Sequence, residues 1–81
     1  MPESVTVVAF GAFRDVNNLE NVIFSSNLKK IAELAFYDAE DLQSLDFPES
    51  LEVIERGAFE YCTGLSSVAI GKNTQVARNA F

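Results

Sequence analysis

Histidine and tryptophan are absent from the 81-residue sequence, and cysteine occurs only once, at Cys62. A single cysteine allows no internal disulfide, and without histidine a nucleophilic cysteine lacks its usual general base. The sequence also has no thiolate pair and no Asp-x-Asp-x-Asp loop that could hold a metal ion. We therefore expect no enzyme, no catalytic or metal-binding residue and no cofactor.

Basic residues are scarce as well. Six lysines and arginines stand against twelve acidic residues, and the net charge is −6. Nucleic-acid phosphates are bound by clustered basic side chains, so no nucleic-acid partner is expected. No apolar run approaches the roughly 18 residues of a membrane span, and no membrane insertion is expected. The first ten residues lack the features of a secretory signal, so the chain is either cytoplasmic or part of a longer protein whose signal lies elsewhere.

Hydrophobic residues make up 48% of the sequence and include seven phenylalanines. That content excludes a disordered acidic tail, and the length allows one small domain at most. The sequence therefore predicts a single domain over residues 1–81.

The hydrophobic residues recur with a period of 23. The sequence divides into three full units, Pro2–Phe24, Ser25–Phe47 and Pro48–Ile70. A partial fourth unit, Gly71–Phe81, needs one deletion to stay in phase. Equivalent positions in successive units form what we call a column. The Phe column is identical in all four units: Phe13, Phe36, Phe59 and Phe81. An alanine precedes each of these phenylalanines.

Each unit contains the pattern of a short strand. Leu42, Leu45 and Phe47 end in the period-2 alternation of a half-buried strand, and a second extended piece carries Leu51 and Ile54 inward. No segment sustains a helical stripe. One unit alone cannot bury its apolar side, whereas stacked units place each column in a ladder whose layers, or rungs, lie about 4.8 Å apart. The sequence predicts a mainly β solenoid of about three and a half stacked repeats with little helix.

The segment from Leu42 to Cys62, LxxLxFPxSLxxIxxxAFxxC, resembles the BspA-like leucine-rich repeat, whose unit of about 23 residues carries an Ala-Phe pair. The resemblance covers essentially the whole chain. It implies a curved β-solenoid with strands lining one face, serving as a non-catalytic binding module. It also implies an extracellular or cell-surface location and a role in adhesion, as part of a longer repeat protein.

The columns also suggest structural roles for the charged residues and the cysteine. Glu33 and Arg56 share a column, as do Lys29 and Glu52, so each pair should face across adjacent rungs. Cys62 occupies a column of small apolar residues, which favours core packing. The carboxylate pairs Glu40–Asp41 and Glu49–Glu52 fall in expected turns, which favours a solvated surface.

The outward positions of the strand following each Ala-Phe corner form the candidate binding surface, which we call the polar strip. Small polar side chains on a sheet suit a protein or glycan partner, and they suit plain solubility equally well. The strip consists of Glu20, Asn21, Ile23, Gln43, Ser44, Asp46, Ser66, Ser67 and Ala69.

Both ends of the stack are expected to lack polar caps, which solenoids need because a terminal rung otherwise exposes its core. Phe10 interrupts a column of charged residues, and Phe81 ends the Phe column, so both are candidate end contacts. Homo-oligomer formation through these ends is one expectation. A structural or self-associating repeat fragment and a small acidic inhibitor remain alternatives to the binding module.

Overall fold

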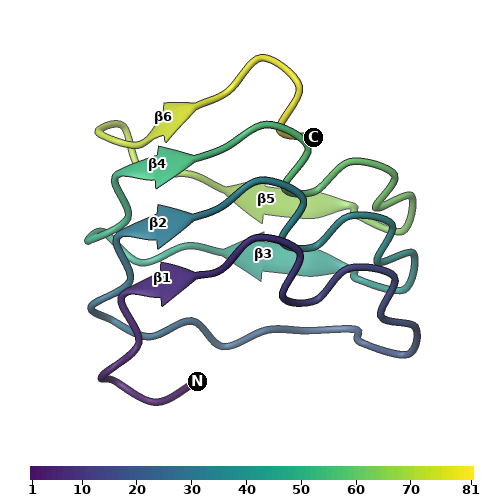
Figure 1. Cartoon of the computed structure of the whole chain (residues 1–81), viewed down its shortest axis with the longest axis horizontal. Helices are drawn as coiled ribbons and strands as arrows, with labels where there is room; N and C mark the ends of the chain where they lie inside the picture. The colour runs from purple at the N-terminus through teal and green to yellow at the C-terminus, as the bar shows by residue number, and fades with distance from the viewer.

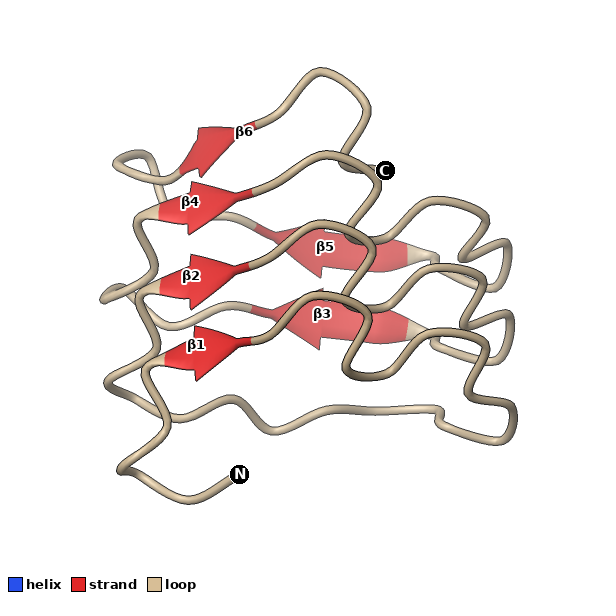
Figure 2. Ribbon diagram, viewed as in Figure 1, coloured by secondary structure: helices blue, strands red, loops and turns tan.

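The computed structural model describes residues 1–81 as a stack of rungs with no helix (Figures 1 and 2). Its six short strands are β1 (Val7–Val8), β2 (Lys30–Ile31), β3 (Ser44–Asp46), β4 (Val53–Ile54), β5 (Ser67–Ala69) and β6 (Gln75–Val76). They form two parallel sheets on opposite sides of the stack: sheet A in the order β1-β2-β4-β6, and sheet B with β3 beside β5. The expected mainly β solenoid is confirmed.

The register follows the sequence period. Val8 pairs with Ile31 and Ile31 with Ile54, each 23 residues further on. Ile54 then pairs with Val76, an offset of 22, where the sequence requires its one deletion. Because every strand is parallel and in register, identical side chains lie directly above one another.

The Phe column runs through the core as a stack of rings. Neighbouring centroids are 5.0 Å apart from Phe13 to Phe36, 5.0 Å from Phe36 to Phe59 and 5.2 Å from Phe59 to Phe81. The ring planes are nearly parallel, at 11°, 7° and 13°. Phe24, at the end of the first unit, meets Phe36 edge-on at 6.1 Å, and Phe47, which directly follows β3, meets Phe59 at 5.6 Å and so ties sheet B to this stack.

The corners continue the backbone ladder beyond the strands. The amides of Phe13, Phe36 and Phe59 each donate to a carbonyl of the next rung, at 2.7, 2.7 and 2.6 Å. One corner column adopts the left-handed backbone conformation in the first three units, with φ of 62° at Gly11, 57° at Leu34 and 68° at Gly57. Glycine enters that region without steric cost and leucine does not, so Leu34 is held there by the ladder bonds of its neighbours.

Two details differ from the sequence expectation. Strands line both sides of the stack rather than the one face that the family resemblance implies. The first unit also forms no strand over residues 19–24, although its apolar pattern matches that of β3. A single ladder bond, from the Gln43 amide to the Glu20 carbonyl at 2.9 Å, joins that segment to the next rung. This end segment has only one neighbouring rung, and its ladder is correspondingly incomplete.

Candidate interaction surface

All nine residues of the polar strip lie exposed on the outer side of sheet B and of the segment before it. On β3 the alternation is complete: Ser44 and Asp46 face solvent while Leu45 is buried between them. On β5 the intervening Val68 is 39% exposed as well, because no further strand of this chain covers that edge. The strip is thus a mainly polar, exposed surface over three rungs.

The strip has a defined order and a single sign of charge. Ser44 Oγ donates to Asn21 Oδ1 at 3.3 Å, and Ser66 Oγ donates to the Gln43 carbonyl at 3.3 Å. Glu20 and Asp46 are its only charged members, so the strip is acidic. These bonds hold the side chains in rows that follow the rungs.

One apolar residue stands out in the strip. Ile23 is 82% exposed and borders a hollow of about 300 Å³ that lies between the first unit and β3, with Val22, Phe24 and Phe47 also in its lining. The hollow lies where the ladder bonds between the two rungs are missing. It offers an apolar contact point within an otherwise polar surface.

A second exposed feature lies at the corner between the two sheets. The Arg14 guanidinium sits over the Tyr37 ring at 5.4 Å and pairs with Asp15 at 3.5 Å. Tyr37 meets the Tyr61 ring edge-on at 5.4 Å, and Tyr61 is 58% exposed. We call Arg14, Tyr37 and Tyr61 the corner ridge. Its loops run directly into the polar strip.

The surroundings of the corner ridge affect its ionisation. Partial burial raises the pKa of Tyr37, and the neighbouring Tyr61, Glu60 and Asp38 add to the rise. Sequence reasoning missed this ridge because only Arg14 and Tyr37 share a column, whereas Tyr61 stands one position further along the next unit. The signal was present, since aromatic residues occur at adjacent corner positions of two successive units.

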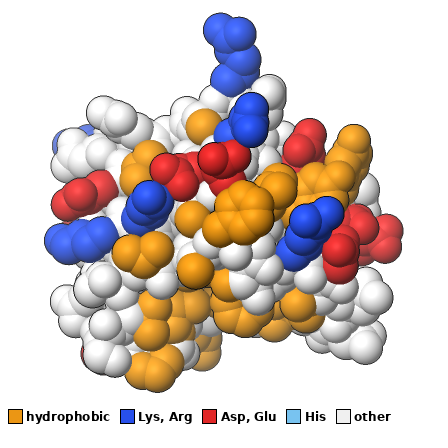
Figure 3. All heavy atoms as spheres, viewed as in Figure 1, with side chains coloured by type: hydrophobic (Ala, Val, Ile, Leu, Met, Phe, Trp, Pro, Cys, Tyr) orange, Lys and Arg blue, Asp and Glu red, His pale blue; other side chains and the backbone are white.

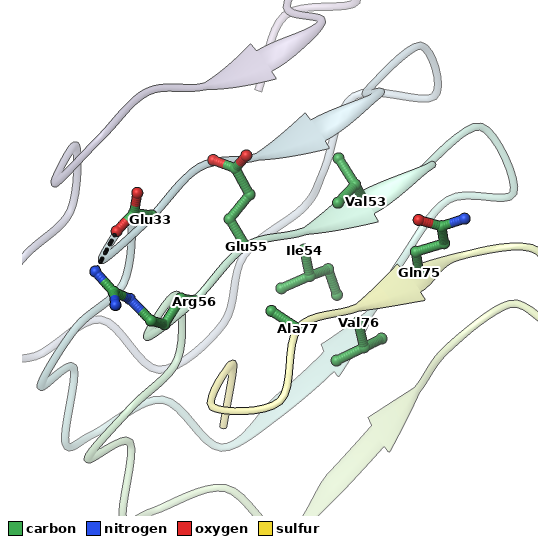
Figure 4. Close-up of a pocket in the computed structure, with 8 residues that line it drawn as sticks. All are labelled: Glu33, Val53, Ile54, Glu55, Arg56, Gln75, Val76 and Ala77. Atoms are coloured by element: carbon green, nitrogen blue, oxygen red, sulfur yellow. Dashed lines mark hydrogen bonds and ion pairs between the residues drawn. The ribbon is translucent and has the colours of Figure 1, made fainter.

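A hollow of about 400 Å³ lies beside β4 and β6, and Figure 4 shows the residues that line it. Across its rim the Arg56 guanidinium contacts the Glu33 carboxylate at 3.1 Å. Glu55, also in the lining, pairs with Lys30 at 3.5 Å. The charged groups neutralise one another across adjacent rungs, and no nucleophile lies among the lining residues. The expected Glu33–Arg56 pair is confirmed.

The other column pair is confirmed too, because Lys29 Nζ lies 3.8 Å from the Glu52 carboxylate. Figure 3 shows acidic, basic and apolar side chains interspersed over the face of sheet A. That mixture suits a solvated surface whose charges help to set the register of the rungs.

The remaining reactive groups pack or face solvent. Cys62 is buried, its Sγ donates to the Phe36 carbonyl at 3.1 Å, and burial raises the pKa of its thiol. Glu40, Asp41, Glu49 and Glu52 are all exposed. No group of three His, Cys, Asp or Glu side chains is arranged to hold a metal ion. No helix has the length and apolar character needed to cross a membrane.

The two candidate end contacts lie at opposite ends of the stack. Phe10, in the first unit, is 65% exposed, and Phe81, in the last, is 46% exposed. The apolar end surface around the first unit includes a hollow of about 450 Å³.

Comparison with known proteins supports the repeat architecture. No curated protein and no solved structure matches the chain. A family model described as BspA type leucine-rich repeat region (6 copies) matches residues 1–81. The match covers the entire sequence and is to a repeat region, as the repeat described above is. The chain belongs to the BspA-type leucine-rich repeat family.

Proposed function

We propose that this chain is a non-catalytic binding module that recognises a protein partner through the polar strip and the adjoining corner ridge. Repeats of this family form interaction modules and are generally non-enzymatic. The observation that carries the proposal is the exposure of all nine strip residues in rows set by the rungs. A rigid, repetitive surface needs little reorganisation on binding, which lowers the entropic cost of association.

The chemistry of the surface favours a particular kind of partner. Glu20 and Asp46 give the strip negative charge without a compensating lysine or arginine. Tyr61 and Arg14 on the corner ridge are of the residue types enriched among energetically dominant interface residues, and Ile23 supplies an apolar contact. The matching partner is a protein with a basic, polar surface. No aromatic residue lies in the strip to stack on a sugar ring, so a glycan is the weaker candidate.

The test is photo-crosslinking from single positions. A photoreactive amino acid replaces Ser44 or Ser67 on the strip, and a matched control carries it at Gln75 on sheet A. Crosslinked partners are identified by mass spectrometry, and the binding of the purified partner is then measured by calorimetry. We expect Ser44→Arg and Ser67→Arg to abolish binding and Gln75→Arg to leave it intact. The reverse pattern would place the binding surface on sheet A and refute the proposal.

Adhesion at a cell surface is part of the same proposal. Beads coated with the 81-residue chain should attach to cells that display the partner, and Ser44→Arg should prevent attachment. Attachment unaffected by that substitution would contradict an adhesive role for the strip.

A further inference from the structure

Tyr61 has a backbone conformation that its residue type disfavours. Its φ is 64°, in the left-handed region, and the equivalent residues of the first two units are Asp15 and Asp38, with φ of 59° and 61°. Aspartate tolerates this region because its short side chain bonds locally to the backbone, whereas a bulky side chain is strained there. The strain lowers stability, so the tyrosine in this column indicates a role outside the fold itself.

Leu34 shows the same departure in a neighbouring column. Its φ is 57°, and the equivalent residues of the units on either side are Gly11 and Gly57, which enter the left-handed region freely. Leu34 belongs to the second unit and has a rung on each side, yet it is only partly buried. The Tyr37 amide donates to the Leu34 carbonyl at 3.2 Å, so this strained residue lies in the same corner as the tyrosines.

The Leu34 side chain reaches the third unit, where it meets an unpaired carboxylate. A Cβ built at Gly57 would lie 2.7 Å from Leu34 Cδ2 and 3.3 Å from Glu60 Oε1, so the two side chains converge over that glycine. Glu60 is partly buried and forms no ion pair, whereas the three glutamates on the side of sheet A each pair with a lysine or arginine. An aliphatic group and a free carboxylate thus lie together.

Two aromatic rings and a second carboxylate complete this group. Tyr37 meets Tyr61 edge-on, with the ring centroids 5.4 Å apart. Partial burial raises the pKa of Tyr37, and Tyr61, Glu60 and Asp38 add to the rise, as expected for carboxylates close to the ring. Asp38 forms no ion pair either. We call these five residues the corner site: Leu34, Tyr37, Asp38, Glu60 and Tyr61.

The chain already contains the contact that such a surface favours. The Arg14 guanidinium lies over the Tyr37 ring, 5.4 Å from its centre, and pairs with the Asp15 carboxylate at 3.5 Å. A guanidinium is planar, stacks on an aromatic face and binds carboxylate oxygens, whereas an ammonium group is a compact and strongly hydrated charge. The corner site offers the same two kinds of group, a ring and a carboxylate, one unit further along the stack.

We propose that the corner site binds an arginine side chain of the protein partner. The guanidinium pairs with the Glu60 carboxylate against the Tyr61 ring, and the alkyl chain of the arginine packs on Leu34. This inference rests on the proposed function, because it names the group of the basic partner that the corner recognises through complementary charge. It also accounts for the strain, since Tyr61 and Leu34 supply contact area that aspartate and glycine lack.

The test is a titration of the 81-residue chain with the peptide acetyl-Gly-Arg-Gly-amide, followed by NMR. We expect saturable shifts of the Leu34 methyl and Tyr61 ring signals. The peptide with lysine in place of arginine should bind more weakly, and the peptide with citrulline, which keeps the shape and loses the charge, should not bind. No saturable shift, shifts confined to the polar strip, or equal binding of arginine and citrulline would overturn the proposal.

Single substitutions locate the contact. Glu60→Gln and Tyr61→Asn should each weaken peptide binding by about tenfold. Glu49→Gln makes the same change of charge on an exposed glutamate in the turn between β3 and β4 and should have no effect. Binding that survives both corner substitutions, or that falls equally in the control, would contradict the assignment.

The stability of Tyr61→Asn separates a role in binding from a role in packing. Asparagine tolerates the left-handed conformation, so the relief of strain should offset the lost ring contact with Tyr37. The thermal midpoint should therefore be no lower than that of the original chain while peptide binding falls. A midpoint lowered by about 4 °C or more would show that the tyrosine is retained for packing and would refute the proposal.

The partner captured by crosslinking distinguishes this proposal from the proposed function. If a partner is captured from Ser44 but binds Glu60→Gln and Tyr61→Asn with unchanged affinity, the corner site fails and the proposed function stands. If no partner is captured while the arginine peptide binds at the corner, arginine recognition stands and the role of the polar strip fails.

Discussion

The middle and the ends of the stack contain the same residues in very different environments. Phe36 is fully buried and Phe81, in the same column, is 46% exposed. Ile54 is fully buried, whereas Val76, one rung further, is 40% exposed. The residue type does not decide burial here, because an apolar side chain is covered only where a rung lies on each side. Stability in such a stack is approximately a sum of rung and nearest-neighbour contributions, and the middle rungs hold most of it.

Replacing phenylalanines of one column should show the largest difference between the middle and the end. Phe36→Ala removes a ring stacked on both faces and should lower the free energy of unfolding by about 3–5 kcal/mol. Phe81→Ala removes a ring that is half exposed, so the loss should be roughly half of that or less. Urea unfolding followed by circular dichroism, at a concentration where the chain is monomeric, measures both. Equal losses would show that burial of the ring does not control its contribution.

Two glycines provide a smaller test of how tightly the middle is packed. A Cβ at Gly64 would lie 2.5 Å from the Glu40 carbonyl oxygen of the adjacent rung, so Gly64→Ala should cost about 1–3 kcal/mol. A Cβ at Gly71 would have no neighbour nearer than 3.7 Å, so Gly71→Ala should be neutral or slightly stabilising. Thermal unfolding of the two variants decides this, and a destabilised Gly71→Ala would contradict the loose packing of the end.

The thiol of Cys62 should make stability depend on pH. Because burial raises its pKa in the folded state, the unfolding free energy should be constant below the pKa of the unfolded thiol, about 8.5, and should fall as pH rises above it. Cys62→Ala, which copies Ala39 of the same column, should abolish this decline. A cysteine introduced as Val16→Cys in that variant lies in the half-buried first unit and should restore only part of it. Urea unfolding at pH 7 to 9.5 measures the decline for the original chain, for Cys62→Ala and for Cys62→Ala with Val16→Cys. The same dependence of unfolding free energy on pH in all three would refute the role of the Cys62 thiol.

The smallest effect is expected from the surface ion pairs. Arg56→Ala breaks the 3.1 Å contact with Glu33, but the two side chains are 73% and 42% exposed, so the cost should be about 0.2–1 kcal/mol and should shrink in salt. Arg78 occupies the same column in the last unit and makes no ion pair. Arg78→Ala should therefore have a smaller effect on the unfolding of the dilute monomer, and a larger effect would contradict this.

The sequence period was sufficient to predict the ladder and its main contacts. Placing Phe13 and Phe36 in one column predicted stacked rings, and the structure has them 5.0 Å apart. The same logic predicted the pairing of Glu33 with Arg56 and the exposure of the strip. These features depend only on which residues share a column, and a repeat supplies that information directly.

Other features were not predicted because sharing a column does not fix the backbone conformation or the side-chain rotation of its members. A leucine does not by itself indicate the left-handed backbone found at Leu34, and the only sign of it in the sequence is the glycine at the same position of the neighbouring units, Gly11 and Gly57. The period places Arg14 and Tyr37 in one column on adjacent rungs, but whether the guanidinium lies over the ring depends on the rotation of the two side chains. The missing strand at residues 19–24 follows from the position of that segment in the stack, because its composition resembles that of β3.

The uniform register has a consequence for how the chain folds. Each rung pairs with the segment 22 or 23 residues away, so every step of assembly closes a loop of nearly the same length. The entropic cost of closure depends on loop length and not on the length of the whole chain. Repeats added to the stack would therefore lower the relative contact order, and the folding rate should not fall as the number of rungs grows.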